Sequence, residues 1–179
     1  MTYWVDVFED IVDAVRADTD NPCTDTDEPF YMHGHPLEVI NLLAKKDRSK
    51  THKFNKYPLI ALFQDFAETI GEDPKIQSTA TLNIIIATQT SPDYTAAQRY
   101  DNTFKTILYP LYELLLKHIQ QSGWFHNVSQ GIYEHTKYDR LFWGRQGLQG
   151  NDGLIFMDHI DAIEITDLSL AMKQRKSCT

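Results

Sequence analysis

The stretch from Thr81 to Ile119 constrains the fold most, because a short apolar run changes directly into a long amphipathic pattern. Residues 81–88 are rich in β-branched side chains, which is typical of a buried strand. From residue 94 onward the apolar side chains recur at helical spacing: Tyr100, Phe104, Ile107, Leu108, Leu111, Leu115 and Ile119. We therefore expect one strand followed by one long helix, with the other elements arranged around that unit.

Local signals predict where this helix begins, bends and ends. Ser91 is a candidate N-cap, Pro92 suits the first helical position, and Asp93 suits the positive end of the helix dipole. Pro110 lacks a backbone N–H, so the helix is expected to kink or split near residues 106–109. Gly123 is expected to end it.

The remaining elements follow from the same periodicities. We expect a helix over 3–17, a short strand at 30–32, a helix or strand over 36–44, a strand over 57–66, a turn at 71–74, and a closing strand over 160–172 with a bulge around 166–167. Together they predict an α+β fold. Its mixed or antiparallel sheet has about four strands, with two or three helices packed on it and a long aromatic and glycine-rich loop.

The chain has 179 residues, 42% of them hydrophobic, which is enough for one good core. We expect a single domain over 1–179, with segments 30–56 and 124–155 as insertions or arms and 173–179 as a basic tail. No apolar run approaches the ~20 residues of a membrane span. The N-terminus lacks the form of a signal peptide, and Cys23 and Cys178 are expected to be free thiols, which favours synthesis in the cytosol.

The net charge of −8 is concentrated at the N-terminus. Residues 1–30 contain nine carboxylates and a single basic residue, Arg16, whereas the acids and bases of the remaining residues balance. This distribution disfavours a general grip on nucleic acid, which needs a basic face. The basic segment 45–56 is expected to be a solvated connection.

No sequence motif makes a positive case for an enzyme. The seven histidines, including His33 and His35, lack the spacing of a zinc site. Nucleophile-elbow, P-loop and dinucleotide-binding patterns do not occur in the sequence. Asp158, Asp161 and Glu164 form an acidic group that is expected to be solvated rather than catalytic. We expect no cofactor and no catalytic or metal-binding residues.

The aromatic segment 124–155 is the best candidate for contact with a partner, because aromatic residues and arginine are enriched at interface hot spots. The interface candidates are Trp124, Phe125, Tyr138, Arg140, Phe142, Trp143 and Arg145. The alternative is that this segment folds back and covers the core of its own domain.

The order of elements resembles that of the tail terminator, or tail completion, proteins of long-tailed bacteriophages. The resemblance rests on an amphipathic helix, a strand entered through Tyr57-Pro58-Leu59-Ile60, an apolar strand, a Ser-Pro-started helix with the phrase Ile107-Leu108-Tyr109-Pro110-Leu111-Tyr112, and a closing strand. It covers roughly residues 3–17, 57–121 and 160–172. The chain departs from compact members of the family in segments 30–56 and 124–155.

The resemblance implies a non-enzymatic structural protein of the virion tail or neck, assembled in the host cytoplasm. Members of that family form a hexameric ring that stops growth of the tail tube and joins the tail to a head-completion or connector protein. DNA passes through such a ring without being held, and no membrane is involved. We expect Asp6, Glu9 and Asp13 to face the lumen, where carboxylates repel phosphates.

Three alternatives remain open at this point. The nearest is another head–tail connector or stopper ring protein, which would touch the portal side. A different class is a metal-dependent hydrolase that uses His33, His35 and a carboxylate. The third is a small adaptor with a peptide groove beside the strand over 81–88.

Overall fold

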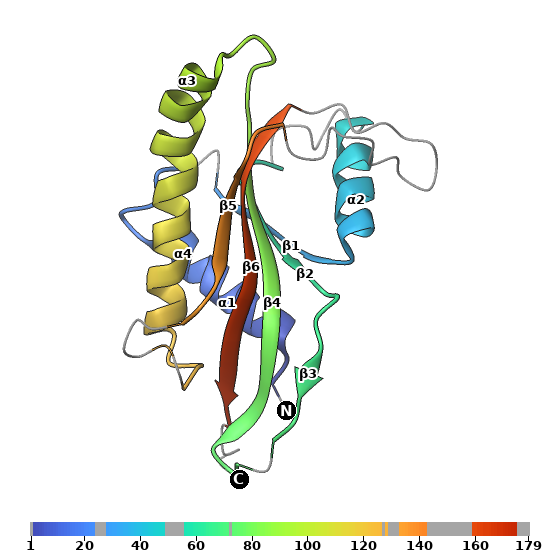
Figure 1. Ribbon diagram of the computed structural model, residues 1–179, viewed down its shortest axis with the longest axis vertical. Coiled ribbons are helices and arrows are strands. Elements are labelled where there is room, and N and C mark those ends of the chain that lie inside the picture. Colours follow the sequence, from blue (N-terminus) through green and yellow to red (C-terminus); the bar gives the residue numbers. More distant parts are fainter. Residues whose placement is uncertain are drawn as a thin grey trace.

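The structure, a computed structural model, describes residues 2–23, 28–48, 56–71, 73–126, 128, 133–142 and 159–174, with the backbone alone for 44–48. Its elements in chain order are α1 (Trp4–Ala17), β1 (Phe30–Gly34), α2 (Pro36–Arg48), β2 (Leu59–Phe63), β3 (Glu68–Thr69), β4 (Ile76–Gln89), α3 (Ala96–Arg99), the π-helix η1 (Tyr100–Leu108), α4 (Tyr109–Gln121), β5 (Thr136–Arg140) and β6 (Ile160–Lys173). The predicted α+β class is confirmed (Figure 1).

The six strands form one mixed sheet in the order β1-β2-β4-β6-β5, and β3 pairs with β4 beside this path. β1 and β2 are parallel, whereas every other pair is antiparallel. The prediction of about four strands was therefore too low. It included neither β3, which has two residues, nor β5, which has five. β4 and β6, each 14 residues long, form the long antiparallel pair near the middle of the sheet (Figure 1).

Helices cover the two faces of the sheet unequally. α1 and the continuous rod formed by α3, η1 and α4 lie on one face, and α2 lies on the other (Figure 1). The larger core contains the apolar face of α1, the inner face of the rod and the inward residues of β2, β4 and β6. A smaller core lies under α2. We call the two sides of the sheet the rod face and the α2 face.

α1 confirms the amphipathic helix predicted for the N-terminus. Its apolar side chains are buried: Trp4, Val7, Phe8, Ile11, Val12 and Val15. Its carboxylates Asp6, Glu9, Asp10 and Asp13 are all exposed. Burying one face of a helix against the sheet leaves the other face free for charge.

The long helix begins later than the sequence signals suggested. Thr95 is the N-cap: its hydroxyl accepts a hydrogen bond from the Gln98 N–H, and the Gln98 side chain accepts one from the Thr95 N–H. This reciprocal capping box satisfies two free donors at once, which a lone Ser91 cap cannot do. The Ser91 hydroxyl accepts instead from the Asp93 N–H within a turn. The predicted start at Ser91-Pro92 was wrong.

The helix changes its hydrogen-bonding pattern at the predicted place without separating into two rods. η1 ends at Leu108 and α4 begins at Tyr109, so Pro110, which has no N–H to donate, lies directly after the π-helical segment. The Tyr109 N–H still bonds to the Phe104 carbonyl, five residues back. The rod ends at Gln121, and Gly123 follows with a φ of +71°, as expected of a glycine after a helix.

The predicted bulge in the closing strand is confirmed at the predicted residues. Leu82 pairs with Leu168 and Ile84 with Ile165, so Thr166 and Asp167 together lie opposite the single residue Asn83. Asp167 has a φ of +58°. The extra residue keeps apolar side chains on the rod face on both sides of the bulge.

The two segments expected to be insertions contribute to the sheet. β1, at the start of segment 30–56, forms one edge, and α2 follows it as a helix, which resolves the helix-or-strand alternative for 36–44. β5, inside segment 124–155, forms the other edge. Its sequence Thr-Lys-Tyr-Asp-Arg lacks an apolar period because an edge strand needs little buried surface.

Candidate interaction surfaces

The structure places five of the seven interface candidates, and these five do not share one environment. Phe125 is buried, Trp124 is half-buried, and Tyr138, Arg140 and Phe142 lie in or directly after β5. Trp143 and Arg145 lie outside the described residues. Sequence reasoning treated these residues as one arm, whereas the described ones occupy the core and the β5 edge.

Phe125 belongs to the core of the subunit. Its ring stacks on Trp4 at a centroid distance of 5.8 Å and lies 6.4 Å from Phe8, and its backbone bridges to Met172. Only 1% of the residue is exposed. Phe125 is therefore a core residue and takes no part in the interaction surfaces of the subunit.

Polar contacts attach β5 to the rod. The Asp139 carboxylate accepts hydrogen bonds from the Tyr109 hydroxyl at 2.7 Å and from the Lys137 ammonium at 2.7 Å. The same ammonium lies 4.5 Å from the centroid of the Tyr109 ring. Burial and the neighbouring Asp139 carboxylate raise the pKa of Tyr109 to about 12, so this hydroxyl remains a donor at neutral pH.

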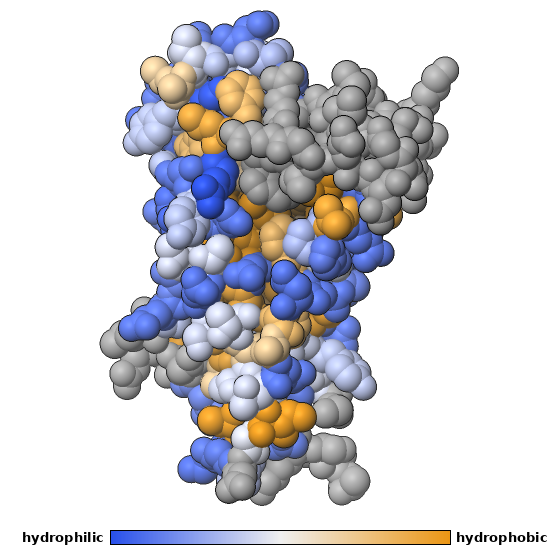
Figure 2. Space-filling model, turned by 45° about the vertical axis from the view of Figure 1, so that its right-hand side comes forward, coloured by the Kyte–Doolittle hydropathy of each residue, from blue (hydrophilic) through white to orange (hydrophobic). Residues whose placement is uncertain are grey.

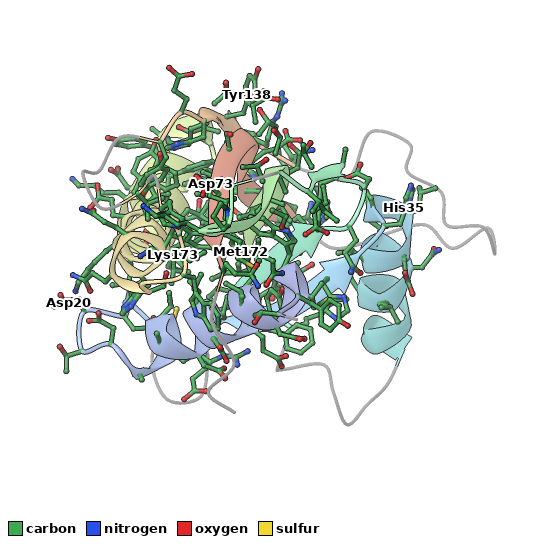
Figure 3. The ribbon with its side chains drawn as sticks, turned by 90° about the horizontal axis from the view of Figure 1, so that it is seen from below. Asp20, His35, Asp73, Tyr138, Met172 and Lys173 are labelled. Atoms are coloured by element: carbon green, nitrogen blue, oxygen red, sulfur yellow. The ribbon has the colours of Figure 1, made fainter. Side chains whose placement is uncertain are left out.

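The α2 face of β5 is open to solvent. Tyr138 is 42% exposed and points outward at the edge of the molecule, on the opposite side from α1 (Figure 3). The Arg140 guanidinium lies 4.5 Å from the Tyr138 ring centroid and bonds to the Glu164 carboxylate on β6 at 2.7 Å. These contacts hold an aromatic ring and a cation side by side, an arrangement found at interface hot spots.

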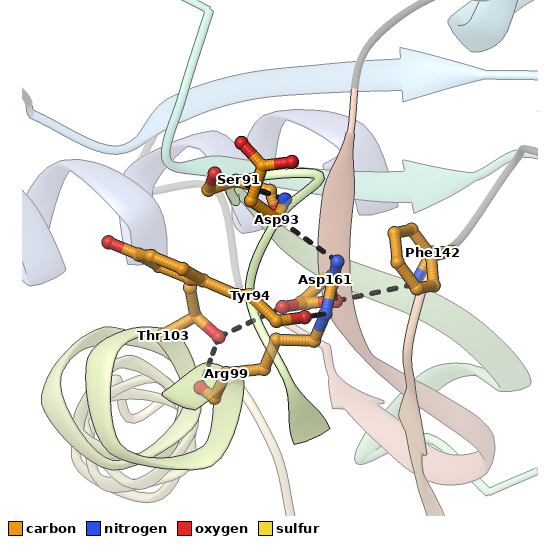
Figure 4. Close-up of polar contacts among 7 residues, drawn as sticks. All are labelled: Ser91, Asp93, Tyr94, Arg99, Thr103, Phe142 and Asp161. Carbon is orange, nitrogen blue, oxygen red and sulfur yellow. Dashed lines mark hydrogen bonds and ion pairs between the residues drawn. The ribbon is translucent and has the colours of Figure 1, made fainter. Parts of the chain in front are cut away.

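A buried ion pair fixes the end of β5 against the start of the rod (Figure 4). Arg99 and Asp161 are 1% and 0% exposed, and Arg99 Nη1 donates to Asp161 Oδ1 at 2.9 Å. The guanidinium also donates to the carbonyls of Tyr94 and Ser91, at 3.2 and 3.0 Å. Its carbon lies 3.5 Å from the centroid of the Phe142 ring.

Every oxygen of the Asp161 carboxylate has a donor. Besides Arg99, Oδ1 accepts from the Phe142 N–H at 3.3 Å and Oδ2 from the Thr103 hydroxyl at 3.0 Å. The expectation that Asp161 is solvated was therefore wrong, and its partner comes from 62 residues away. Glu164 is paired with Arg140, and Asp158 lies outside the described residues. A fully paired, closed cluster of this kind positions elements and offers no free group for chemistry.

The carboxylates of α1 make a second surface, beside β1. Tyr31 on β1 donates from its hydroxyl to the Val5 carbonyl at 3.1 Å. Burial, followed by the nearby charges of Glu9 and Asp6, raises the pKa of Tyr31. The hydroxyl end of Tyr31 therefore lies against the first turn of α1. Of the α1 acids, Asp13 pairs with Arg16 at 2.5 Å.

Polar contacts of Asp18 join the C-terminal end of α1 to α4. Asp18 accepts hydrogen bonds from the Lys117 ammonium at 3.0 Å and from His118 Nε2 at 2.7 Å. An open pocket of about 360 Å³ lies beside it, between α1 and the end of α4. Asp10, His118 and Trp124 are among its lining residues.

The histidines proposed for a hydrolase do not converge in the structure. His33 bonds to Gln64 at 2.9 Å, and His35 accepts from the Leu37 N–H at the start of α2. Among the described residues, no three His, Cys, Asp or Glu side chains are placed to hold one metal ion. None of the described helices has the length and apolar character to cross a bilayer.

Comparison with known proteins does not add an assignment. No protein-family model matches the chain, and no curated protein is significantly similar to it.

Proposed function

We propose that this protein is a non-enzymatic structural component of a bacteriophage virion, a tail terminator that forms a ring on the end of the tail tube. The proposal rests on the resemblance in element order and on the nature of the subunit surface. The resembling segments form α1, β2, β4, the rod and β6, which together build the larger core. The segments that carry the resemblance thus pack around one hydrophobic core.

One observation carries the proposal: the two edges of the sheet present different chemistry on opposite sides of the subunit. β1 lies next to the acidic helix α1, since the Tyr31 hydroxyl bonds to the Val5 carbonyl, whereas β5 presents the exposed Tyr138 ring with the Arg140 guanidinium 4.5 Å from its centroid (Figure 3). A closed ring requires two different and complementary patches on each subunit, because each patch contacts the other kind on a neighbour.

The α1 acids fit the passage of DNA through such a ring. Asp6, Glu9 and Asp13 are exposed on one side of one helix. Facing the lumen, they would repel phosphates and let the DNA slide. A structure of the ring that places them on the outer rim contradicts this assignment. The partners proposed are further copies, expected as a hexamer, the tail tube protein, and a head-completion or connector protein.

The function is tested by adding the purified protein to polymerising tail tube protein. We expect shorter tubes with an added density at one end in electron micrographs, and tubes that no longer elongate when more tube protein is supplied. Unchanged tube growth with binding to a portal-side ring supports the stopper alternative. Unchanged growth with stoichiometric zinc or manganese in the purified protein supports the hydrolase.

A matched pair of variants tests the lumen assignment in assembled particles. Replacing Asp6, Glu9 and Asp13 with their amides removes three charges and leaves the buried face of α1 unchanged. We expect normal rings with slower or incomplete DNA ejection. The control replaces the three exposed carboxylates Glu113, Asp101 and Asp93, which lie along the rod and before it, and is expected to eject DNA normally.

A further inference from the structure

The two open edges of the sheet match each other in length and in level. β1 and β5 each contain five residues. The ladder places them at the same height, because four rows of paired residues cross all five strands: Phe30-Leu59-Ala87-Ala162-Arg140, Tyr31-Ile60-Ile86-Ile163-Asp139, Met32-Ala61-Ile85-Glu164-Tyr138 and His33-Leu62-Ile84-Ile165-Lys137. No strand in the described part of the chain pairs with the outer side of either edge.

We propose that β5 of one copy pairs with β1 of a second copy, so that the sheets of neighbouring subunits join edge to edge around the ring. This inference rests on the proposed ring and specifies how it closes. β1 runs parallel to β2, and both are antiparallel to β4, as is β6; β5 is antiparallel to β6 and therefore runs with β4. Two copies in the same orientation thus bring β5 and β1 together as an antiparallel pair.

The backbone of β1 directs hydrogen-bonding groups toward the edge where such a pair would form. Phe30 donates its N–H to the Pro58 carbonyl, and the Gly34 carbonyl accepts from the Gln64 N–H, so alternate residues of β1 bond toward β2. The backbone groups of Tyr31 and His33, between them, point to the open edge. A second strand would give these groups the partners that an edge strand otherwise lacks.

The equal length and equal level of β1 and β5 favour a second copy of this chain as the occupant. Pairing at equal level places Lys137 opposite His33 of the neighbour, both on the rod face. The same register places Asp139 opposite Tyr31, so the Lys137–Asp139 ion pair enters the contact as a neutral unit. An edge pair at equal level adds no step between neighbours, which a closed ring requires, whereas a stepped pair generates a helical filament.

Cysteine pairs test the contact and its register. In a Cys23→Ser/Cys178→Ser background, His33→Cys is combined with Lys137→Cys, two sites that are opposite and on the same face in the proposed pair. Directly opposed residues bring their Cβ atoms within about 5.5 Å, within reach of a disulfide after a small adjustment. We expect oxidation to give a ladder of covalent multimers ending at the ring size, and reducing agent to return single chains.

The control combines His33→Cys with Tyr138→Cys, the next residue of β5, whose side chain lies on the other face. We expect no ladder from it. Equal ladders from both pairs overturn the register. Rings without a ladder from the first pair overturn the edge contact and leave the proposed function standing, whereas single chains with and without tube protein contradict both.

Hydrogen exchange gives a second readout on the unmodified protein. The amides of Tyr31 and His33 are expected to become at least tenfold more protected in rings than in single subunits. Amides on the exposed turns, such as that of Gly71, should exchange equally fast in both states. Equal exchange of Tyr31 and His33 in both states overturns the edge contact without relying on a substituted chain.

Discussion

The Arg99–Asp161 pair connects three parts of the chain that are far apart in sequence. The guanidinium holds the turn before the rod through the carbonyls of Ser91 and Tyr94, and the carboxylate holds the end of β5 through the Phe142 N–H. Each polar atom of the cluster has its partner within the subunit. The pair therefore fixes where the β5 edge lies relative to the rod.

Removing one partner of this pair leaves a buried, uncompensated charge. For Asp161→Ala we expect a loss of about 3–5 kcal/mol in the free energy of unfolding. Urea denaturation curves of the variant and the unmodified protein measure the difference. Glu164→Ala is the control: it also removes a carboxylate from β6, but its pair with Arg140 is exposed, and about 0–1 kcal/mol is expected. Equal losses for both variants contradict the assignment.

Asp18 gives the protein an acid-sensitive contact between α1 and α4. Hydrogen bonds from the Asp20 N–H and the Lys117 ammonium lower the pKa of Asp18 from 3.8 to about 2. Because the folded state lowers this pKa, the contact stabilises the fold above pH 3.8 and loses its effect as the pH falls toward 2.

Asp18→Asn tests this pH dependence. At pH 7 the variant should be less stable than the unmodified protein, and the difference should shrink between about pH 4 and pH 2. Urea midpoints at pH 7, 4, 3 and 2 measure it. Asp20→Asn is the control, since Asp20 is exposed and makes only the longer contact with Lys117, at 3.3 Å. A stability difference for Asp18→Asn that is constant with pH disagrees with the expected titration.

The bulge at Thr166-Asp167 determines which side chains of β6 enter the core. Without the extra residue, the strand beyond it would turn its apolar side chains away from the rod face. Asp167 occupies the left-handed backbone region at a φ of +58°. Its N–H bonds to the Asn83 side chain across the bulge, at 3.3 Å.

Backbone conformation, more than side-chain chemistry, should decide which residues are tolerated at position 167. Asp167→Val puts a β-branched residue into the left-handed region and should cost about 1–3 kcal/mol. Asp167→Gly should be neutral or slightly stabilising, because glycine adopts positive φ without strain. Thermal unfolding of both variants measures the contrast. A valine variant as stable as the glycine variant contradicts this explanation.

The sequence predicts those elements whose signals are local. The apolar face of α1, the end at Gly123 and the bulge near Asp167 each follow from residues within a few positions of one another. The start of the rod was missed because a capping box at Thr95 satisfies more donors than a serine followed by proline. A search for a Thr with Gln three residues later finds it.

Features that depend on distant partners were not predictable from one sequence. β5 lacks an apolar period and forms a strand because β6 is there to pair with it. Asp161 resembles a solvated acid until Arg99, 62 residues away, is placed beside it. Phe125 is of a residue type that is enriched at interfaces, but it packs against Trp4 and Phe8 in the core.

Across the subunit the sheet runs from β1 to β5, and no further strand among the described residues pairs with either of these edges. Apolar side chains gather in a band along the middle of one side, flanked by polar surface (Figure 2). The most different surfaces, α1 beside β1 and Tyr138 on β5, lie on opposite sides of the subunit (Figure 3). The proposed ring uses both of these surfaces, one from each of two neighbouring copies.

The mass of the protein in solution tests ring formation most directly. Native mass spectrometry over a range of concentrations, with and without tail tube protein, counts the copies in each particle. We expect a sixfold assembly of the 20.7 kDa chain, or a monomer that becomes sixfold when tube protein is added. A monomer that remains monomeric at every concentration, and that ignores tube protein, contradicts the proposed ring.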